Sequence, residues 1–298
     1  MSLDLSSLAA PDVVEALDYE TIRAALIADY QILYPEFAAE VESEPAIKLL
    51  ETAAYRELGI RQRINDAARA LLLTDATGAD LDLIAFTYYN GLTRLQISAG
   101  DPDAIPPVPA TYESDKRLRE RCRLSLYGRS CAGPKNAYKY FAMTASADVK
   151  HVHVSKHTPA PGDVTLIILS EVGDGVPTQE LLDTVQAALD EEEVRPLNDT
   201  PIVLPATVDL WSLDASLICY PDANTSLALQ LANAAAEQFA ADHHALGHDI
   251  TISALHAALH VAGVQKVVID TPAADLVTDD TAARFNIAIN IAITGTAS

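Results

Sequence analysis

The sequence predicts an α+β fold in which an N-terminal long-helix region precedes two small α+β lobes. Through residues 19–95 the apolar residues recur every three or four positions, which is the period of a helix that buries one side. Beyond Asp148 the period becomes two, as in VKHVHV (149–154) and FNIAINIAI (285–293), which is the period of half-buried strands. Helical runs separate these strands, so we expect helices and strands to mix along the rest of the chain.

The length bounds the number of domains. The 298 residues suffice for roughly two domains with real cores, and 49% of them are apolar, which excludes a disordered chain. The segment AGDPDAIPPVPAT (99–111) contains four prolines and is the clearest linker. We therefore expect a helical bundle region at 1–95, a proline-rich linker with a basic helix at 96–130, a first lobe at 131–206 and a second lobe at 207–298.

The long helix has marked ends. Ser43 can cap it, Pro45 suits its first turn, and Gly78 after Thr77 is a natural stop, so we expect helix from Pro45 to Leu73. About 29 residues at 1.5 Å each give a helix roughly 43 Å long. A 95-residue segment cannot easily cover such a length alone, so the helix is expected to pack on other chains as well.

Two lines of apolar residues follow this helix. The first, interrupted by Arg56, comprises Leu49, Ala53, Ile60, Ile64, Ala67 and Leu71. The second widens the stripe with Leu50, Ala54, Leu58, Ala68 and Leu72. The pairs Glu57 with Arg61 and Asp66 with Arg69 stand at helical pairing distance, each worth a few tenths of a kcal/mol. The first line and Arg56 are our candidate interface.

Shorter helices surround it. Asp18 can cap a helix that Pro35 ends, and Asp80 can cap LDLIAFTYY. Ser114 can cap a basic helix with Leu118, Cys122 and Leu126 in line, and Pro134 opens another helix in a first-turn position.

In the C-terminal half, VTLIIL and PIVLPATVDL read as strands around a helix in PTQELLDTVQAALD. The apolar phase switches between Leu210 and Trp211, which predicts a bulge or bend. A helix, a Val-rich strand and a long apolar strand occur twice, near 149–169 and again near 264–293. Their partner helices, 178–190 and 224–241, stand in opposite order. This pattern suggests two related lobes of permuted order.

Charge is distributed unevenly. The net charge is −22, yet residues 101–150 carry 9 bases and 6 acids, whereas residues 151–298 carry 4 bases and 20 acids. The basic helix, with Arg119 and Arg123 as candidate contacts, faces either acidic parts of the same fold or an acidic partner. Nucleic acid is not an expected partner, because the rest of the chain would repel phosphate.

The chain shows little sign of catalytic chemistry. His256 and His260 stand four apart, as metal ligands can, but HAALH lacks the glutamate of a zinc hydrolase. His151 and His153 alternate with valines, so we expect them on a solvated strand face. No nucleotide, nucleophile-elbow or CxxC motif occurs, and the three cysteines are scattered. We therefore predict no enzyme, cofactor or metal.

The ordered segments SEPAIKLLETAAYRELGIRQRINDAARA, ATGADLDLIA, YESDKRLRERCRLSL, AGPKNAY, VRPLNDT and GHDITISALHAALHVAGVQKV resemble the baseplate J family of contractile-tailed phages. The match runs in the same order over nearly the whole chain. The stretch TYYNGLTRLQISAG and the prolines after it depart from the family pattern.

The resemblance implies a structural wedge protein of the tail baseplate. In such proteins the helical regions bundle with a second copy and with a baseplate I-like partner, and the C-terminal lobes join wedges into a ring around the tail hub, near a lysozyme-like wedge protein. It implies assembly in the host cytoplasm and a final place in the virion, without a membrane partner. The alternatives are the equivalent component of a phage-derived contractile injection system, or a metal-dependent enzyme using His256 and His260.

Overall fold

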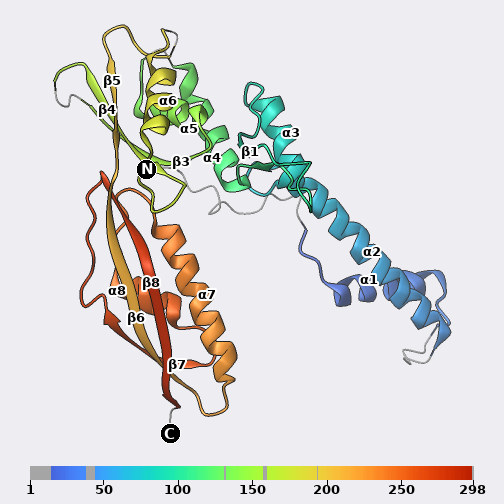
Figure 1. Ribbon diagram of the computed structural model, residues 1–298. Helices are drawn as coiled ribbons and strands as arrows, with labels where there is room; N and C mark the ends of the chain where they lie inside the picture. Colours follow the sequence, from blue (N-terminus) through green and yellow to red (C-terminus); the bar gives the residue numbers. More distant parts are fainter. Residues whose placement is uncertain (1–14, 38–43, 131, 157–159, 193, 297–298) are drawn as a thin grey trace. The chain divides into compact units, whose positions relative to one another are not determined.

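The computed structural model describes residues 15–37, 44–130, 132–156, 160–192 and 194–296 (Figure 1). The chain forms two compact units. The helical unit comprises Met1–Thr93 together with Asp115–Arg119, and the sheet unit comprises Arg94–Ser114 together with Glu120–Ser298. Each unit is described by itself.

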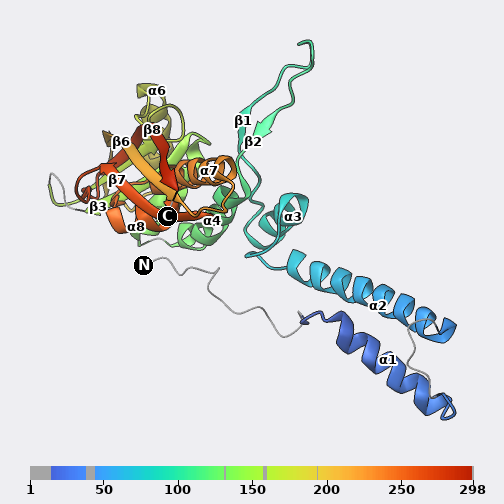
Figure 2. The same cartoon turned by 90° about the horizontal axis from the view of Figure 1, so that it is seen from below.

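The helical unit is built on a pair of helices. α1 (Tyr19–Leu33) lies alongside α2 (Pro45–Ala70), as both views show (Figures 1 and 2). The predicted cap of α1 is confirmed, since the Asp18 carboxylate accepts hydrogen bonds from the amides of Glu20 and Thr21. Ile22 of α1 and Ile47 and Ala54 of α2 are buried. α3 (Gly78–Tyr88) buries Leu81, Ile84 and Ala85.

The end of α2 differs from the sequence prediction. The helix ends at Ala70 instead of Leu73, and Gly78, expected as its stop, begins α3 with φ +54°. Thr77 is the N-cap residue of α3, so Asp80 lies in its first turn instead of capping it. At the other end Glu44 is the N-cap residue of α2 without a side-chain bond, and Ser43 lies outside the described residues.

The expected linker contains strands. β1 (Gln96–Ser98) and β2 (Thr111–Tyr112) pair antiparallel, and a bridge joins Asp101 to Val108. Figure 2 shows the segment as a narrow hairpin. Its prolines fall between the paired strands, where no ladder donor is needed. α4 (Asp115–Ser125) follows and buries Leu118 and Cys122, but Leu126, expected in the same line, is exposed.

The first sheet has the order β3-β4-β5. β3 (Val149–Lys156) pairs antiparallel with β4 (Asp163–Ser170), and β4 pairs parallel with β5 (Thr200–Pro205). α5 (Lys135–Ala145), preceded by a short 3-10 turn at Tyr127–Arg129, and α6 (Gln179–Asp190) pack on one face of this sheet. Pro134 is the N-cap residue of α5 and not a first-turn residue.

The second sheet has the order β7-β6-β8. β6 (Thr207–Cys219) pairs antiparallel with β7 (Val264–Thr271) and parallel with β8 (Ala282–Thr296). α7 (Thr225–His243) and α8 (Ile252–Leu259) cover one face. The predicted irregularity near Trp211 is confirmed by a register shift between Trp211 and Ser212.

Both sheets share one arrangement, in which a middle strand has an antiparallel neighbour on one side and a parallel neighbour on the other. The chain reaches it in a permuted order, since β4-α6 follows α5-β3 whereas β6-α7 precedes α8-β7. The sequence pattern matched β4 of the first lobe to β8 of the second as equivalent strands, and this match was wrong, because β6 is the middle strand of the second sheet. The long apolar run of β8 suggested a central strand, but β8 lies at the edge.

The mixed α+β class is confirmed, and the two lobes share a core. Ile167 and Leu169 of β4 pack with Ala206, Leu246 and Ala283. β4 is thus buried on both faces, which explains its uninterrupted apolar sequence. Among the described residues, no helix is both long and apolar enough to cross a membrane.

Candidate functional site

The predicted interface line runs along α2 on the side away from α1. Leu49, Ile60, Ile64 and Leu71 are 72%, 61%, 55% and 78% exposed, and Ala53, Arg56 and Ala67 are also exposed. At 100° per residue these side chains fall within one narrow stripe, about 120° round the helix from Ala54. The structure thus gathers all seven α2 candidates on one surface, hereafter the exposed stripe.

The opposite side of α2 explains why the stripe remains open. α1 packs on α2, and the second apolar line of α2 is less exposed than the first, since Ala54 is buried and Leu50, Leu58, Ala68 and Leu72 are half-buried. One helix cannot cover both lines, because they point in different directions. One side of α2 is therefore covered within the chain, and the exposed stripe on another side remains apolar and accessible to solvent.

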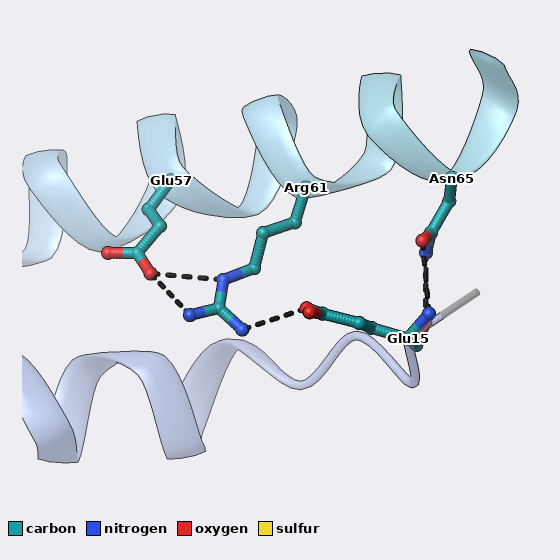
Figure 3. Close-up of polar contacts among 4 residues, drawn as sticks. All are labelled: Glu15, Glu57, Arg61 and Asn65. Carbon is teal, nitrogen blue, oxygen red and sulfur yellow. Dashed lines mark hydrogen bonds and ion pairs between the residues drawn. The ribbon is translucent and has the colours of Figure 1, made fainter. Parts of the chain in front are cut away.

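A polar cluster fixes the segment before α1 to α2 (Figure 3). Asn65, only 3% exposed, accepts a hydrogen bond from the Glu15 amide (3.0 Å) and donates one to the Glu15 carbonyl (2.8 Å). Arg61 donates to Glu57 Oε1 (2.7 Å) and to Glu15 Oε2 (3.0 Å). Hydrogen bonding to Glu57 and the nearby carboxylate of Glu15 raise the pKa of Arg61. Sequence reasoning missed Asn65, since a polar residue in a helix gives no signal of a backbone partner 50 residues away.

The predicted Glu57–Arg61 pair is confirmed by this cluster. The predicted Asp66–Arg69 pair is not formed, because Asp66 instead accepts a hydrogen bond from Gln62 (2.7 Å). Both alternatives are helical i,i+4 or i,i+3 neighbours, so local geometry alone did not decide between them.

The basic helix uses two of its arginines inside the chain. The Arg119 guanidinium donates to the carbonyls of Leu73 (2.6 Å) and Ala76 (2.8 Å), in the turn after α2. Arg121 forms a buried ion pair with Glu113, whose carboxylate also accepts from the Leu95 amide (3.2 Å) and whose carbonyl accepts from Arg94 (2.8 Å). Arg123 is half-buried. Of the two interpretations of the basic island, contact with an acidic part of the same fold holds for Arg121, whereas Arg119 binds backbone carbonyls, which neither interpretation predicted.

The histidines lie differently from our expectation. His151 is not on a solvated face, since its Nδ1 accepts the Leu246 amide hydrogen (3.1 Å) and burial lowers its pKa to about 4. His244 is buried beside Lys150 (Nζ to Nδ1, 3.1 Å). Desolvation, and to a smaller extent the positive charge of Lys150, lowers the pKa of His244 to about 4. Burial also lowers the pKa of His153. His151 and His244 each contact a residue of the other lobe, and thus help to join the two lobes.

His256 and His260, the candidates of the metal alternative, lie at the C-terminal end of α8. α8 ends at Leu259, and His260 is its exposed C-cap residue, whose N–H donates to the His256 carbonyl (3.1 Å). Nowhere in the described ranges do three or more His, Cys, Asp or Glu side chains gather as a metal site would require.

Three successive parts of the chain match domains of one known protein family. Residues 42–101 match the Baseplate J-like N-terminal domain, residues 130–205 the Baseplate J-like central domain, and residues 211–289 the Baseplate J-like protein C-terminal domain. The chain belongs to the baseplate J-like family. The resemblance seen in the sequence is thereby confirmed, and the chain is a structural protein of the phage tail baseplate, located in the virion.

One relative is similar over most of its length. The chain is 42% identical to "Baseplate protein J" of Escherichia phage P2 over 290 residues, which cover 95% of both chains. Among solved structures, the 6-fold symmetrised baseplate of the anti-feeding prophage contains a chain that is 12% identical, with a TM-score of 0.42, covering 60% of this chain and 43% of that one.

Proposed function

We propose that this baseplate protein is a wedge component of a contractile tail, in which the exposed stripe of α2 bundles with helices of a second copy and of a baseplate I-like protein. The observation that carries the proposal is that an apolar line more than twenty residues long remains accessible although α1 lies beside the same helix. Contiguous exposed apolar surface of this kind marks protein interaction sites.

Magnitudes favour hydrophobic contact as the main force in this bundle. Each large side chain of the stripe can contribute about 1.5–3 kcal/mol on full burial. The exposed ion pairs of α2, such as Glu57 with Arg61, contribute about 0.2–1 kcal/mol each. A partner that covers Leu49, Ile60, Ile64 and Leu71 would therefore bind α2 mainly through them.

The proposal assigns the C-terminal lobes to contacts that join neighbouring wedges around the tail hub, close to a lysozyme-like wedge protein. It assigns no catalytic role to the chain. The relative of phage P2 supports a place in a multi-subunit baseplate, since it is named as a baseplate protein and matches both lobes as well as the helices.

Replacing Ile60 and Ile64 together by aspartate tests the bundle. Two charges in the middle of the stripe should abolish co-purification with the baseplate I-like protein, because burying either charge without a partner is costly. The chain itself should stay folded, since both residues are more than half exposed.

Thr52→Asp with Gly59→Asp is the matched control, because it adds the same charge to exposed positions of α2 outside the stripe, and no atom lies within 4 Å of a Cβ placed at Gly59. This control should bind at wild-type affinity, and Trp211 fluorescence should report a folded second lobe in both variants. Wild-type affinity in the Ile60→Asp, Ile64→Asp variant would show that the stripe is not the interface.

A further inference from the structure

The two three-stranded sheets of the described chain end in four edge strands, and three of these strands carry features that discourage pairing with another chain. β3 has Lys150 next to a register shift, β5 contains Pro201 and Pro205, and β7 carries Lys266 and Asp270. Charges, prolines and bulges are the usual means of protecting an edge. β8 differs, because it has neither a charged residue nor a proline from Phe285 to Thr296.

The open part of β8 is regular. The register with β6 shifts around Ile287 and again around Thr294, and between these points Ala288 to Ile293 pair with Ser212 to Leu217 without interruption. Among the described strands only β6 pairs with β8, so the other edge of this stretch has no strand beside it. Its backbone amides and carbonyls on that side are available to a further strand.

The sequence of this stretch indicates which strand fits. Residues 287–293 read Ile-Ala-Ile-Asn-Ile-Ala-Ile, which is the same in both directions about Asn290. If a second copy pairs antiparallel about a two-fold axis at Asn290, Ile289 lies opposite Ile291 and Ala288 opposite Ala292. Like residues then meet at every position, and the odd-numbered side chains of both copies stay on one face.

The face of β8 that carries the odd-numbered side chains is incompletely covered. Ile289, Ile291 and Ile293 are only partly buried on the cluster under α7 and α8, whereas their β6 neighbours Leu213, Ala215 and Leu217 are at most 4% exposed. A strand added at the β8 edge would cover the three isoleucines. The segment is also uncharged in a chain of net charge −22, so two copies can approach here with less repulsion than elsewhere.

At the centre, Asn290 is exposed and donates one hydrogen bond to Asp214 (2.8 Å). A side-chain amide has two N–H groups and a carbonyl oxygen, so Asn290 retains a donor and an acceptor for its counterpart. We propose that β8 is a self-association edge, which pairs with β8 of a second copy about a two-fold axis at Asn290 and makes one six-stranded sheet. This deepens the self-association part of the proposed function.

Disulfide cross-linking of the purified full-length chain tests both the contact and its register. A single strand pair buries less surface than a stable dimer interface, so covalent trapping is preferable to an equilibrium mass. In the proposed register, two Asn290→Cys residues face each other with Cα atoms about 4.5–5.5 Å apart, within disulfide range. Two Ala292→Cys residues are offset by four positions, about 13 Å along the strand.

We expect Asn290→Cys to link with itself on the order of ten times faster than Ala288→Cys or Ala292→Cys alone, because only the first pair lies within disulfide reach. A mixture of the Ala288→Cys and Ala292→Cys chains should link as fast as Asn290→Cys. The wild-type chain measures the background from Cys122, Cys131 and Cys219. Far-UV circular dichroism and Trp211 fluorescence check that each variant is folded.

A second pair of variants tests the edge itself. Adding Ala292→Lys to Asn290→Cys should slow linking to background, whereas adding Val268→Lys, on the opposite edge of the same sheet, should not. Linking of Asn290→Cys at the wild-type background, or equal linking by Ala292→Cys alone, would overturn the proposal. Because the Ile60→Asp, Ile64→Asp chain retains β8, it should still link through Asn290→Cys, and failure of the helix bundle is thus distinguishable.

Discussion

At the residue scale, polar side chains decide how segments distant in sequence are joined. Asn65 binds both backbone groups of Glu15, and His151 accepts the amide hydrogen of Leu246, 95 residues away. Each contact satisfies backbone groups that would otherwise be costly to remove from water. Each contact therefore holds together two segments that lie far apart in the sequence.

The lowered pKa values of His151 and His244 predict a pH dependence of stability. The pKa values of His151 and His244 are lowered to about 4 in the fold, chiefly by desolvation, with Lys139, His153 and His248 also acting on His151 and Lys150 on His244. Asp174 partly opposes the shift of His244. The neutral form is favoured in the fold, so the stabilisation is full above pH 6.5 and is lost as pH falls towards 4.

We expect the free energy of unfolding to fall on the order of 1–2 kcal/mol per histidine between pH 7 and pH 5. Urea unfolding followed by Trp211 fluorescence measures it. His151→Asn, which keeps an acceptor for the Leu246 amide, should reduce this dependence, whereas His260→Asn, at an exposed C-cap, should not. An unchanged pH dependence in His151→Asn would contradict the assignment.

At the element scale, the ends of helices are set by contacts that a local pattern does not contain. α2 stops at Ala70 although the apolar period continues through Leu71 and Leu72. The carbonyls of Leu73 and Ala76 are bound by Arg119, which stabilises the turn where the sequence predicted another turn of helix. A charged donor on two backbone carbonyls is a strong local constraint.

Replacing Arg119 by alanine should therefore destabilise the helical unit by about 2–3 kcal/mol, since hydrogen bonds from a charged donor contribute about 1.5–3 kcal/mol each and partial exposure weakens them. Amide hydrogen exchange should increase at residues 71–77. Arg63→Ala, an exposed position of α2, is the control and should change stability by less than about 0.5 kcal/mol. Equal effects of the two substitutions would show that the Arg119 contacts do not hold this turn.

At the scale of the whole molecule, the two lobes belong to one compact unit and share a cluster of buried side chains. Leu246, 5% exposed, packs with Ile167 and Leu169 of the first sheet and with Ala283 of the second. A chain cut near Pro205 would expose Ile167 and Leu169. Such a truncation would therefore also damage the first lobe.

Leu246→Ala should lower the stability of both lobes together, by about 2–5 kcal/mol, because it opens a cavity in their shared cluster. Trp211 fluorescence reports the second lobe, and amide exchange at β3 and β4 reports the first. The two probes should shift to the same urea midpoint. A shift seen by one probe alone would show that the lobes unfold independently.

The sequence by itself determined the α+β class, the family, the positions of most elements and the apolar line on α2. These depend on periods and capping residues within one segment, which local physical chemistry fixes. The palindrome in β8 is also visible in the sequence, but only the strand order shows that it lies at the edge of a sheet.

Only the tertiary structure decided which line of α2 is covered, where α2 ends, that His151 is half-buried and His244 buried, and that β6 is the middle strand while β8 lies at an edge. Each depends on a partner distant along the chain, such as α1 for the second apolar line or Arg119 for the turn after α2. The period of the apolar residues predicts which side chains of a helix or strand are buried. It does not predict which element covers them, because many packings bury the same residues.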